Sequence, residues 1–196
     1  MTDQKIDTKE LIINETIKLI KDKKDADKIS MRSIAKNADI AVSVINYHFQ
    51  TKANLIDKAV QNYVRNIIKN SNQRHSSMSL TPEQRIRSGI NAAANFLAEN
   101  PGISRVSILN GLKDGHIGDN SDQMYKSILN QLKEYFNNLY DETTFKILAQ
   151  QQLSALQQIF LRHKVFKEQT GLDFFNKKDR KKITETIVNT FIGKLK

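Results

Sequence analysis

The chain has 196 residues, a formal net charge of +10 and no cysteine. The missing cysteines exclude a disulfide framework, a thiolate metal site and a thiol nucleophile, which fits the reducing cytoplasm. No stretch is long and apolar enough to span a membrane or is patterned as a signal peptide. Two prolines and seven glycines in the whole chain favour long uninterrupted helices, so we expect an all-α fold in a cytoplasmic protein without a membrane partner.

The first predicted helix runs from Thr8 to Lys24. Its apolar residues recur at helical spacing and are Leu11, Ile13, Ile17 and Ile20. A polar connector, Asp25 to Ile29, follows this helix. Ser30 can then cap the next helix by accepting a hydrogen bond from a backbone N–H. We expect the first helix to cover the two short helices that come after Ser30.

The stretch from Ser30 to Lys52 predicts two short helices joined by a tight turn at Ala38, Asp39 and Ile40. Glycine is usual at the centre of such turns, and Asp39 is a permissible substitute because aspartate visits the left-handed region more readily than most residues. The inward positions of the two helices are Ile34, Ala35, Ala38, Ile45 and Phe49.

The outward face of the second short helix is small and polar. Its residues are Val42, Ser43, Asn46, Tyr47 and His48. A helix that presents such groups is suited to lie in a DNA major groove. Ala41 stands where a hydroxyl or amide would cap this helix, so the cap is lost unless Ser43 or water replaces it. The alternative is a helical hairpin within an all-α core, although a buried hairpin would not leave so many polar groups on one side.

These residues resemble the DNA-binding motif of the TetR family of bacterial transcriptional regulators. The residues that carry the resemblance are Arg32, Ile34, Ala35, Ala38, Ile40, Ile45, Tyr47, His48, Phe49, Lys52 and Leu55. Asp39 replaces the usual glycine, Ala41 the usual capping residue, and Asn46 stands where tyrosine is common. The resemblance implies a three-helix, helix-turn-helix DNA-binding domain at residues 1–52 and a helical ligand-binding and dimerisation domain at residues 53–196.

The resemblance also implies how a homodimer meets a double-stranded DNA operator. The helix start at Ser30 would seat a phosphate, and Val42 would lie on the DNA-facing side. Phosphates would be held by Arg32, Tyr47, His48 and Lys52, and base edges would be touched by Ser43, Val44 and Asn46. From Met1 to Arg65 there are twelve basic and nine acidic residues, a net charge of +3, so net charge alone does not mark this segment.

Apolar residues at helical spacing predict further helices beyond Lys52. These are Ala53 to Ser71, Thr81 to Asn100, Ile103 to Lys113, Ser121 to Tyr140, Thr143 to Thr170 and Ile183 to Leu195. The first of them is, by the resemblance, the lever that transmits ligand binding. The polar segment from Ser71 to Ser79 is predicted as a domain boundary, and Asp114 to Asp122 as a loop.

The last two predicted helices suit a four-helix bundle made with the same pair from a partner chain, and the resemblance favours this homodimer. The alternative is that they pack only within the monomer. The candidates to line a cavity for an unidentified small-molecule effector, apolar or aromatic, are Phe96, Met124, Tyr125 and Phe160. The alternative for each of these four side chains is ordinary core packing.

No pattern for a metal, a cofactor or an enzyme nucleophile appears. The four histidines are scattered, and His116 with Asp119 is the nearest approach to a metal pair. The predicted function is therefore a TetR-type, ligand-released repressor that binds a palindromic operator as a homodimer, without enzyme activity. Two other classes remain: a helical protein-interaction or adaptor domain, which would lack salt-dependent affinity for its own upstream DNA, and a helical enzyme, which would turn over a small molecule.

Overall fold

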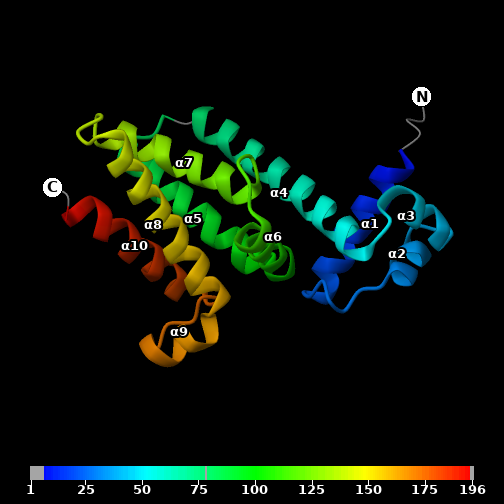
Figure 1. Cartoon of the computed structure of the whole chain (residues 1–196). Coiled ribbons are helices and arrows are strands. Elements are labelled where there is room, and N and C mark those ends of the chain that lie inside the picture. Colours follow the sequence, from blue (N-terminus) through cyan, green and yellow to red (C-terminus); the bar gives the residue numbers. More distant parts are fainter. Residues whose placement is uncertain (1–6, 78, 195–196) are drawn as a thin grey trace. The chain divides into compact units, whose positions relative to one another are not determined.

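The computed structural model describes residues 7–77 and 79–194, and within them it contains ten α-helices and no strand. The helices are α1 Thr8–Lys23, α2 Met31–Asn37, α3 Val42–Phe49, α4 Lys52–Ser77, α5 Pro82–Glu99, α6 Pro101–Asp114, α7 Asn120–Tyr135, α8 Glu142–Leu161, α9 His163–Thr170 and α10 Lys177–Lys194 (Figure 1). The predicted all-α fold is confirmed. No helix in the described ranges is both long enough and apolar enough to cross a membrane.

The chain divides into two compact units. Unit 1 contains the described residues of Met1–Ile67 together with Asn100–Gly115, and unit 2 contains Ile68–Glu99 together with the described residues of His116–Lys196. Unit 1 is therefore discontinuous, because α6 belongs with α1, α2, α3 and the first part of α4. This division follows packing; the functional division at residue 52 stays a prediction.

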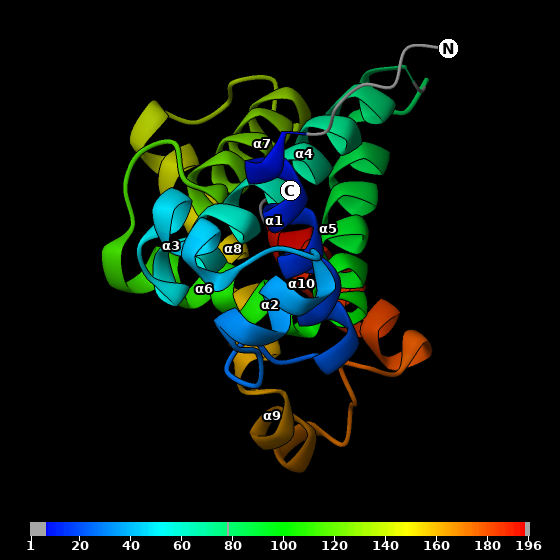
Figure 2. The same cartoon turned by 90° about the vertical axis from the view of Figure 1, so that its right-hand side faces the viewer.

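In unit 1, α1 packs against α2 and α6, and α2 packs against α3 (Figure 2). The fully buried large side chains come from these four helices and from α4, and are Ile12, Ile20, Ile34, Ile45, Phe49, Leu55 and Ile103. Burial of each such side chain is worth about 1.5–3 kcal/mol. The two short helices after Ser30 are therefore held in place by their inward apolar residues, as the spacing predicts.

The turn between α2 and α3 has the predicted conformation. Asp39 has a φ of 52°, in the left-handed region, and the Ile40 N–H donates to the carbonyl oxygen of Ala35 at 3.1 Å. At the start of α2, the Ser30 hydroxyl accepts from the Ser33 N–H at 3.1 Å. The Ser33 hydroxyl in turn accepts from the Ser30 N–H at 2.9 Å, which completes a capping box.

The N-terminus of α6 lies directly against the connector that follows α1. A Cβ atom placed on the buried Gly102 would lie 2.7 Å from the carbonyl carbon of Lys24 and 2.9 Å from the N atom of Asp25. Further along α6, the Asn110 side-chain amide donates to the Asp57 carboxylate on α4 at 2.8 Å. One helix of unit 1 is therefore tied to both α1 and α4.

In unit 2, helices α5, α7, α8 and α10 run alongside one another (Figure 1). They enclose one apolar cluster, whose buried members are Ile86, Ile90, Ile128, Leu129, Leu132, Phe136, Phe145, Ala149, Leu153, Val188 and Ile192. The antiparallel helices α5 and α7 are also joined at the surface by an ion pair, in which Nη1 of Arg85 lies 3.4 Å from Oε1 of Glu134. The cluster is the main core of this unit.

Several helix ends differ from the sequence expectation. The helix predicted to end at Ser71 continues to Ser77 as α4, because the segment after Ser71 has no proline or glycine to stop it. The domain boundary predicted at Ser71 to Ser79 stays a prediction. The predicted helix from Thr143 to Thr170 is interrupted at Arg162, between α8 and α9. Helix α7 ends at Tyr135, because Asn137 and Asn138 adopt positive φ values of 48° and 55°.

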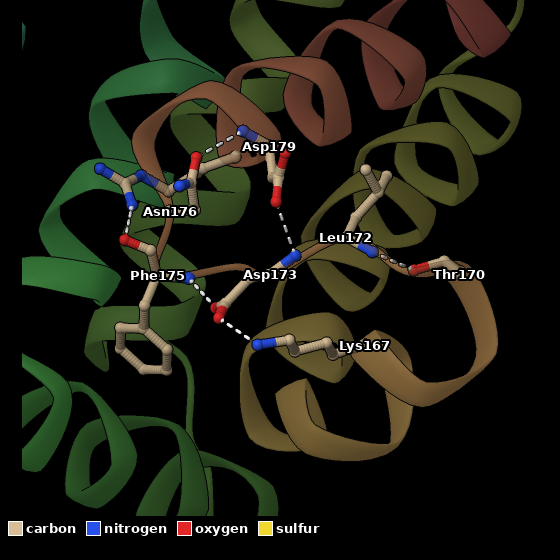
Figure 3. A network of polar contacts seen from close by, with 8 residues as sticks. Lys167, Thr170, Leu172, Asp173, Phe175, Asn176 and Asp179 are labelled. Carbon is tan, nitrogen blue, oxygen red and sulfur yellow. Dashed lines mark hydrogen bonds and ion pairs between the residues drawn. The ribbon is translucent and has the colours of Figure 1, made fainter.

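The connection from α9 to α10 is ordered by polar contacts (Figure 3). The Asp173 carboxylate accepts from the Lys167 ammonium at 2.9 Å and from the Phe175 N–H at 2.8 Å. The Asp179 carboxylate accepts from the Asp173 N–H at 3.0 Å. The Asn176 side chain caps α10, which therefore begins at Lys177 and not, as predicted, at Ile183.

Candidate nucleic-acid interface

Helix α3 is anchored on one side and exposed on the other. Ile45 and Phe49 are fully buried. Of the predicted outward positions, Ser43, Asn46 and Tyr47 are exposed, whereas Val42 and His48 are half-buried, as is Val44, the third predicted base contact. The exposed face of α3 is therefore formed by Ser43, Asn46 and Tyr47, opposite the buried Ile45 and Phe49.

The aromatic part of this face is held by ring contacts. Tyr47 is 83% exposed, and its ring meets that of His48 edge to face, with centroids 5.1 Å apart. The His48 ring in turn lies 6.3 Å from that of the buried Phe49. The Tyr47 side chain is therefore exposed to solvent while its ring contacts that of His48. Its hydroxyl is suited to a hydrogen bond with a phosphate oxygen.

The other predicted DNA contacts lie outside α3. Arg32 is exposed on the first turn of α2, whereas the Ser30 hydroxyl is engaged in the capping box. The Lys52 ammonium donates to the carbonyl oxygen of Asp27 at 3.2 Å, which ties the start of α4 to the connector before α2. An ammonium has three N–H donors, so this bond leaves two for another acceptor. Sequence reasoning missed this tie and the role of Ser33.

Helix α3 begins without a side-chain cap. Its N-cap residue is Ala41, and no side chain accepts a hydrogen bond from the first turn, so Ser43 does not replace the missing cap. The first N–H groups of a helix have no partner within the helix. In α3 these N–H groups lie in the same first turn as the exposed Ser43.

No protein-family model and no curated protein sequence matches the chain. Solved structures do match. A TetR-family transcriptional regulator from Mesorhizobium loti has a TM-score of 0.66 at 18% identity, covering 95% of both chains. A TetR-family regulator from Thermus thermophilus has a TM-score of 0.60 at 15% identity, covering 91% of this chain and 97% of its own.

This chain has the TetR-family fold.

A third match is the transcriptional regulator FadR from Bacillus subtilis, in complex with stearoyl-CoA. Its TM-score is 0.64 at 13% identity, covering 93% of this chain and 96% of the FadR chain. These matches extend over both units, so the resemblance that the sequence carries in the region of α2 and α3 applies to the fold of the whole chain.

Within the TetR fold, the four predicted effector-lining residues lie in different surroundings. Met124 and Tyr125 on α7 are half-buried and pack against the apolar cluster of unit 2. Phe160 on α8 is only 4% exposed, and its ring contacts that of Phe174 at 5.8 Å. Phe96 is half-buried on α5. Met124 and Tyr125 thus share one cluster, whereas Phe160 belongs to a separate group of rings.

Two buried polar residues of unit 2 were missed by sequence reasoning. Gln152 on α8 is fully buried, and Arg180 on α10 is 7% exposed. The Arg180 guanidinium donates to the Asn95 side-chain oxygen at 2.9 Å and to the carbonyl oxygens of Phe174 and Phe175 at 3.0 and 3.2 Å. The one signal for Gln152 is its spacing, seven residues after Phe145 and three after Ala149, on the buried face of α8.

In the loop before α7, the acidic side chains bond the local backbone and a lysine. The Asp119 carboxylate accepts from the N–H groups of His116 and Asp122, at 3.2 and 2.8 Å, and so caps α7. Lys126 donates to the Asp122 carboxylate and holds its pKa below the ordinary value. Over the part of the chain that the structure describes, no group of three or more histidine and acidic side chains is placed to hold a metal ion.

Proposed function

We propose that this protein is a TetR-type transcriptional regulator, a ligand-released repressor that binds a palindromic operator as a homodimer. The observation that carries the proposal is the free face of α3, where Asn46 and Tyr47 are exposed while Ile45 and Phe49 are fully buried. A short helix fixed in this way can enter a major groove without unfolding its support.

The side chains of α3 divide by chemistry. The Asn46 amide can pair with the N6 and N7 positions of adenine, and the half-buried Val44 can contact a thymine methyl group. Ser43 reaches either kind of base edge. Beside them, Arg32, Tyr47, His48 and Lys52 hold phosphates and set the register of the helix on the duplex.

The missing cap of α3 supports a phosphate contact by its backbone. The N–H groups of the first turn behind Ala41 have no side-chain acceptor, and the positive end of the helix dipole favours an anion there. A DNA phosphate would satisfy these donors only in the complex. The capped start of α2, where Ser30 and Ser33 bond each other, leaves Arg32 as the phosphate-binding group of that helix.

The exposed faces of α8 and α10 are the proposed dimer contact. Both helices bury one side in the core of unit 2 and present the other to solvent, including Ile147, which is 54% exposed. The same faces of two chains would form a four-helix bundle with two-fold symmetry. The two α3 helices would then read half-sites about 34–36 Å apart.

Release of DNA would follow from a small molecule bound in unit 2. FadR, with the same fold, is in complex with stearoyl-CoA, which supports an effector with a large apolar part. To switch a dimer almost completely, the effector must prefer the DNA-free arrangement by about 5.5 kcal/mol. Helix α4, which contributes residues to both units, would carry the change.

A footprint on the DNA that flanks the protein's own gene tests the proposal. We expect a protected palindrome, and an affinity that falls linearly with salt on a log–log plot, because each phosphate contact releases counterions. Absence of a protected site, together with an affinity that salt does not change, would remove the proposed function.

Asn46→Ala separates base reading from phosphate binding. We expect a loss of about 1–3 kcal/mol at one base pair of each half-site and relaxed preference there, measured by competition with single-base operator variants. The matched control is Asn130→Ala, which removes an exposed amide from α7 in unit 2. An equal loss of affinity on every DNA sequence would instead show that Asn46 contacts the DNA backbone.

A further inference from the structure

The core of unit 2 contains an amide that the protein does not satisfy. Gln152 is 0% exposed, and neither its Oε1 nor its Nε2 atom has a hydrogen-bond partner. Among the described residues, Gln152 alone has two such buried side-chain atoms without a bond. Because a buried polar group without a partner costs about 1–3 kcal/mol, a residue that keeps two of them open in a core requires an explanation.

The position of Gln152 along the bundle follows from contacts on both sides of it. On α8, Gln157 bonds Ser121 of α7 at 3.4 Å, and the Phe145 ring contacts that of Phe136 near the other end of α7. Since α7 and α8 are antiparallel, these two pairs place Gln152 between the levels of Lys126 and Leu129, close to Ile128.

At this level two polar side chains of neighbouring helices, Asn91 and Thr184, bond each other. Arg85 on α5 meets Glu134 on α7, so the position on α5 opposite Ile128 is close to Asn91. The Asn91 side-chain oxygen accepts from the hydroxyl of the buried Thr184 on α10. The apolar cluster supplies the rest of the surroundings, with Met124 and Tyr125 packed against it one turn away.

We propose that Gln152 is the recognition group of the effector site, and that it binds an uncharged small molecule whose apolar or aromatic body carries one group that both donates and accepts, an amide or a hydroxyl. This inference rests on the proposed function. Gln152 offers one acceptor and two donors, and an amide ligand pairs with both atoms, whereas a carboxylate would leave Oε1 without a donor.

Charge argues for the same class of ligand. The nearest buried cation in the described part of α10 is Arg180, and its guanidinium is bonded by Asn95, Phe174 and Phe175. These three oxygens engage Nε and Nη1 of the guanidinium within the protein and hold Arg180 against the connection between α9 and α10. Gln152 is, by contrast, a neutral amide whose Oε1 and Nε2 atoms both lack a hydrogen-bond partner.

The first test measures the ligand-free protein. Gln152→Met keeps the length of the side chain and removes the polar atoms, so we expect the melting temperature to rise by about 2–4 °C, which corresponds to the removal of one unsatisfied group in a chain of this size. Gln169→Met, at an exposed position of α9, is the control and should leave it unchanged. A lower melting temperature for Gln152→Met would show that the free protein already satisfies the amide, and would overturn the proposal.

The second test uses matched aromatic probes. These are benzamide, which donates and accepts; acetophenone, which only accepts; ethylbenzene, which does neither; and benzoate, which is anionic. The corresponding two-ring compounds 2-naphthamide, 2-acetonaphthone, 2-ethylnaphthalene and 2-naphthoate extend the apolar part. By calorimetric titration we expect each amide to bind about tenfold more tightly than its ketone, as one to two buried hydrogen bonds imply, and Gln152→Met to abolish that preference.

Equal binding of amide and ketone, preferential binding of the carboxylates, or no binding of either amide would overturn the proposal. DNA binding is measured on the same proteins. If Gln152→Met binds the upstream DNA as the unsubstituted chain does while losing the amide preference, the inference and the proposed function both stand. If neither protein binds DNA, the proposed function fails. The calorimetric titration still measures separately whether the protein binds the amide probes through Gln152.

Discussion

At the scale of single residues, Gly102 determines how closely α6 approaches the connector after α1. The distances of 2.7–2.9 Å from a Cβ at this position to the backbone of Lys24 and Asp25 are shorter than Cβ contacts allow. The obstacle is backbone and cannot rotate away as a flexible side chain does. Glycine is therefore required here by contact and not by backbone conformation.

Gly102→Ala should destabilise the protein by about 1–3 kcal/mol, the usual cost of overpacking a buried contact. Denaturant unfolding followed by circular dichroism measures this. Gly193→Ala is the matched control, because a Cβ at Gly193 in α10 meets nothing within 4 Å; it should be neutral or stabilise the chain by up to about 1 kcal/mol through helix propensity. Equal stability of the two variants would contradict the close approach.

At the scale of secondary-structure elements, the two short helices of unit 1 start differently. Helix α2 has a complete capping box between Ser30 and Ser33, whereas α3 starts at Ala41 with no side-chain cap. The stability of α3 therefore depends on the burial of Ile45 and Phe49. Its first turn is the part of the motif with least support.

Ala41→Ser should add a cap to α3 and stabilise the free protein by about 1 kcal/mol, while Ser30→Ala should destabilise it by a similar amount. Thermal unfolding measures both. If the backbone of α3 binds a phosphate as proposed, the new hydroxyl competes for the same N–H groups, so Ala41→Ser should also weaken DNA binding. Tighter DNA binding by Ala41→Ser would argue against that backbone contact.

The α9–α10 connection should respond to acid. The Lys167 ammonium and the Phe175 N–H hold the pKa of Asp173 below its ordinary value. A lowered folded-state pKa contributes stability above the ordinary carboxyl pKa of about 4, and that contribution is lost as the pH falls through the lowered value. Asp173→Asn should therefore melt earlier than the unsubstituted protein at pH 7, with the difference vanishing on acidification. A difference that does not depend on pH would contradict this.

At the scale of the whole molecule, the proposed dimerisation would join the two units in one function, because only a symmetric pair would present two α3 helices to one operator. The proposed contact uses the exposed faces of α8 and α10. These faces contain Ile147 among polar neighbours, so a charge at that position should be enough to disturb the contact.

Ile147→Lys should shift the protein from dimer to monomer in analytical ultracentrifugation and reduce its affinity for operator DNA, while leaving its helical content unchanged. The matched control is Leu139→Lys, because Leu139 is 67% exposed but lies in the connection between α7 and α8, outside both helices of the proposed contact. A dimer that survives Ile147→Lys and fails with Leu139→Lys would place the interface elsewhere.

The sequence predicted well what local patterns control. The inward positions Ile34, Ile45 and Phe49 are buried, the left-handed turn at Asp39 is present, and Thr81 caps α5 through a bond from the Gln84 N–H. These features depend on spacing and on the chemistry of single residues, so one chain is enough to find them.

Features that depend on contacts between distant segments were not predicted. Gln152 stands in a run of three glutamines that resembles a solvated surface, and its burial follows only from the rotation of α8 against its neighbours. The cap at Asn176 and the bonds to Arg180 need the loop geometry that joins α9 to α10. The packing of α6 with α1 depends on a chain reversal more than seventy residues downstream.

The discontinuity of unit 1 has a consequence for chimaeric regulators. Exchanging DNA specificity between two proteins of this fold by a single crossover after α3 or within α4 would join a foreign α1 to the resident α6. Any recipient with a side chain at the position of Gly102 would then meet the Lys24 backbone of the donor. A chimaera that is to keep the donor's operator affinity must therefore carry two separate gene segments from the donor, the second encoding the fourteen residues of α6.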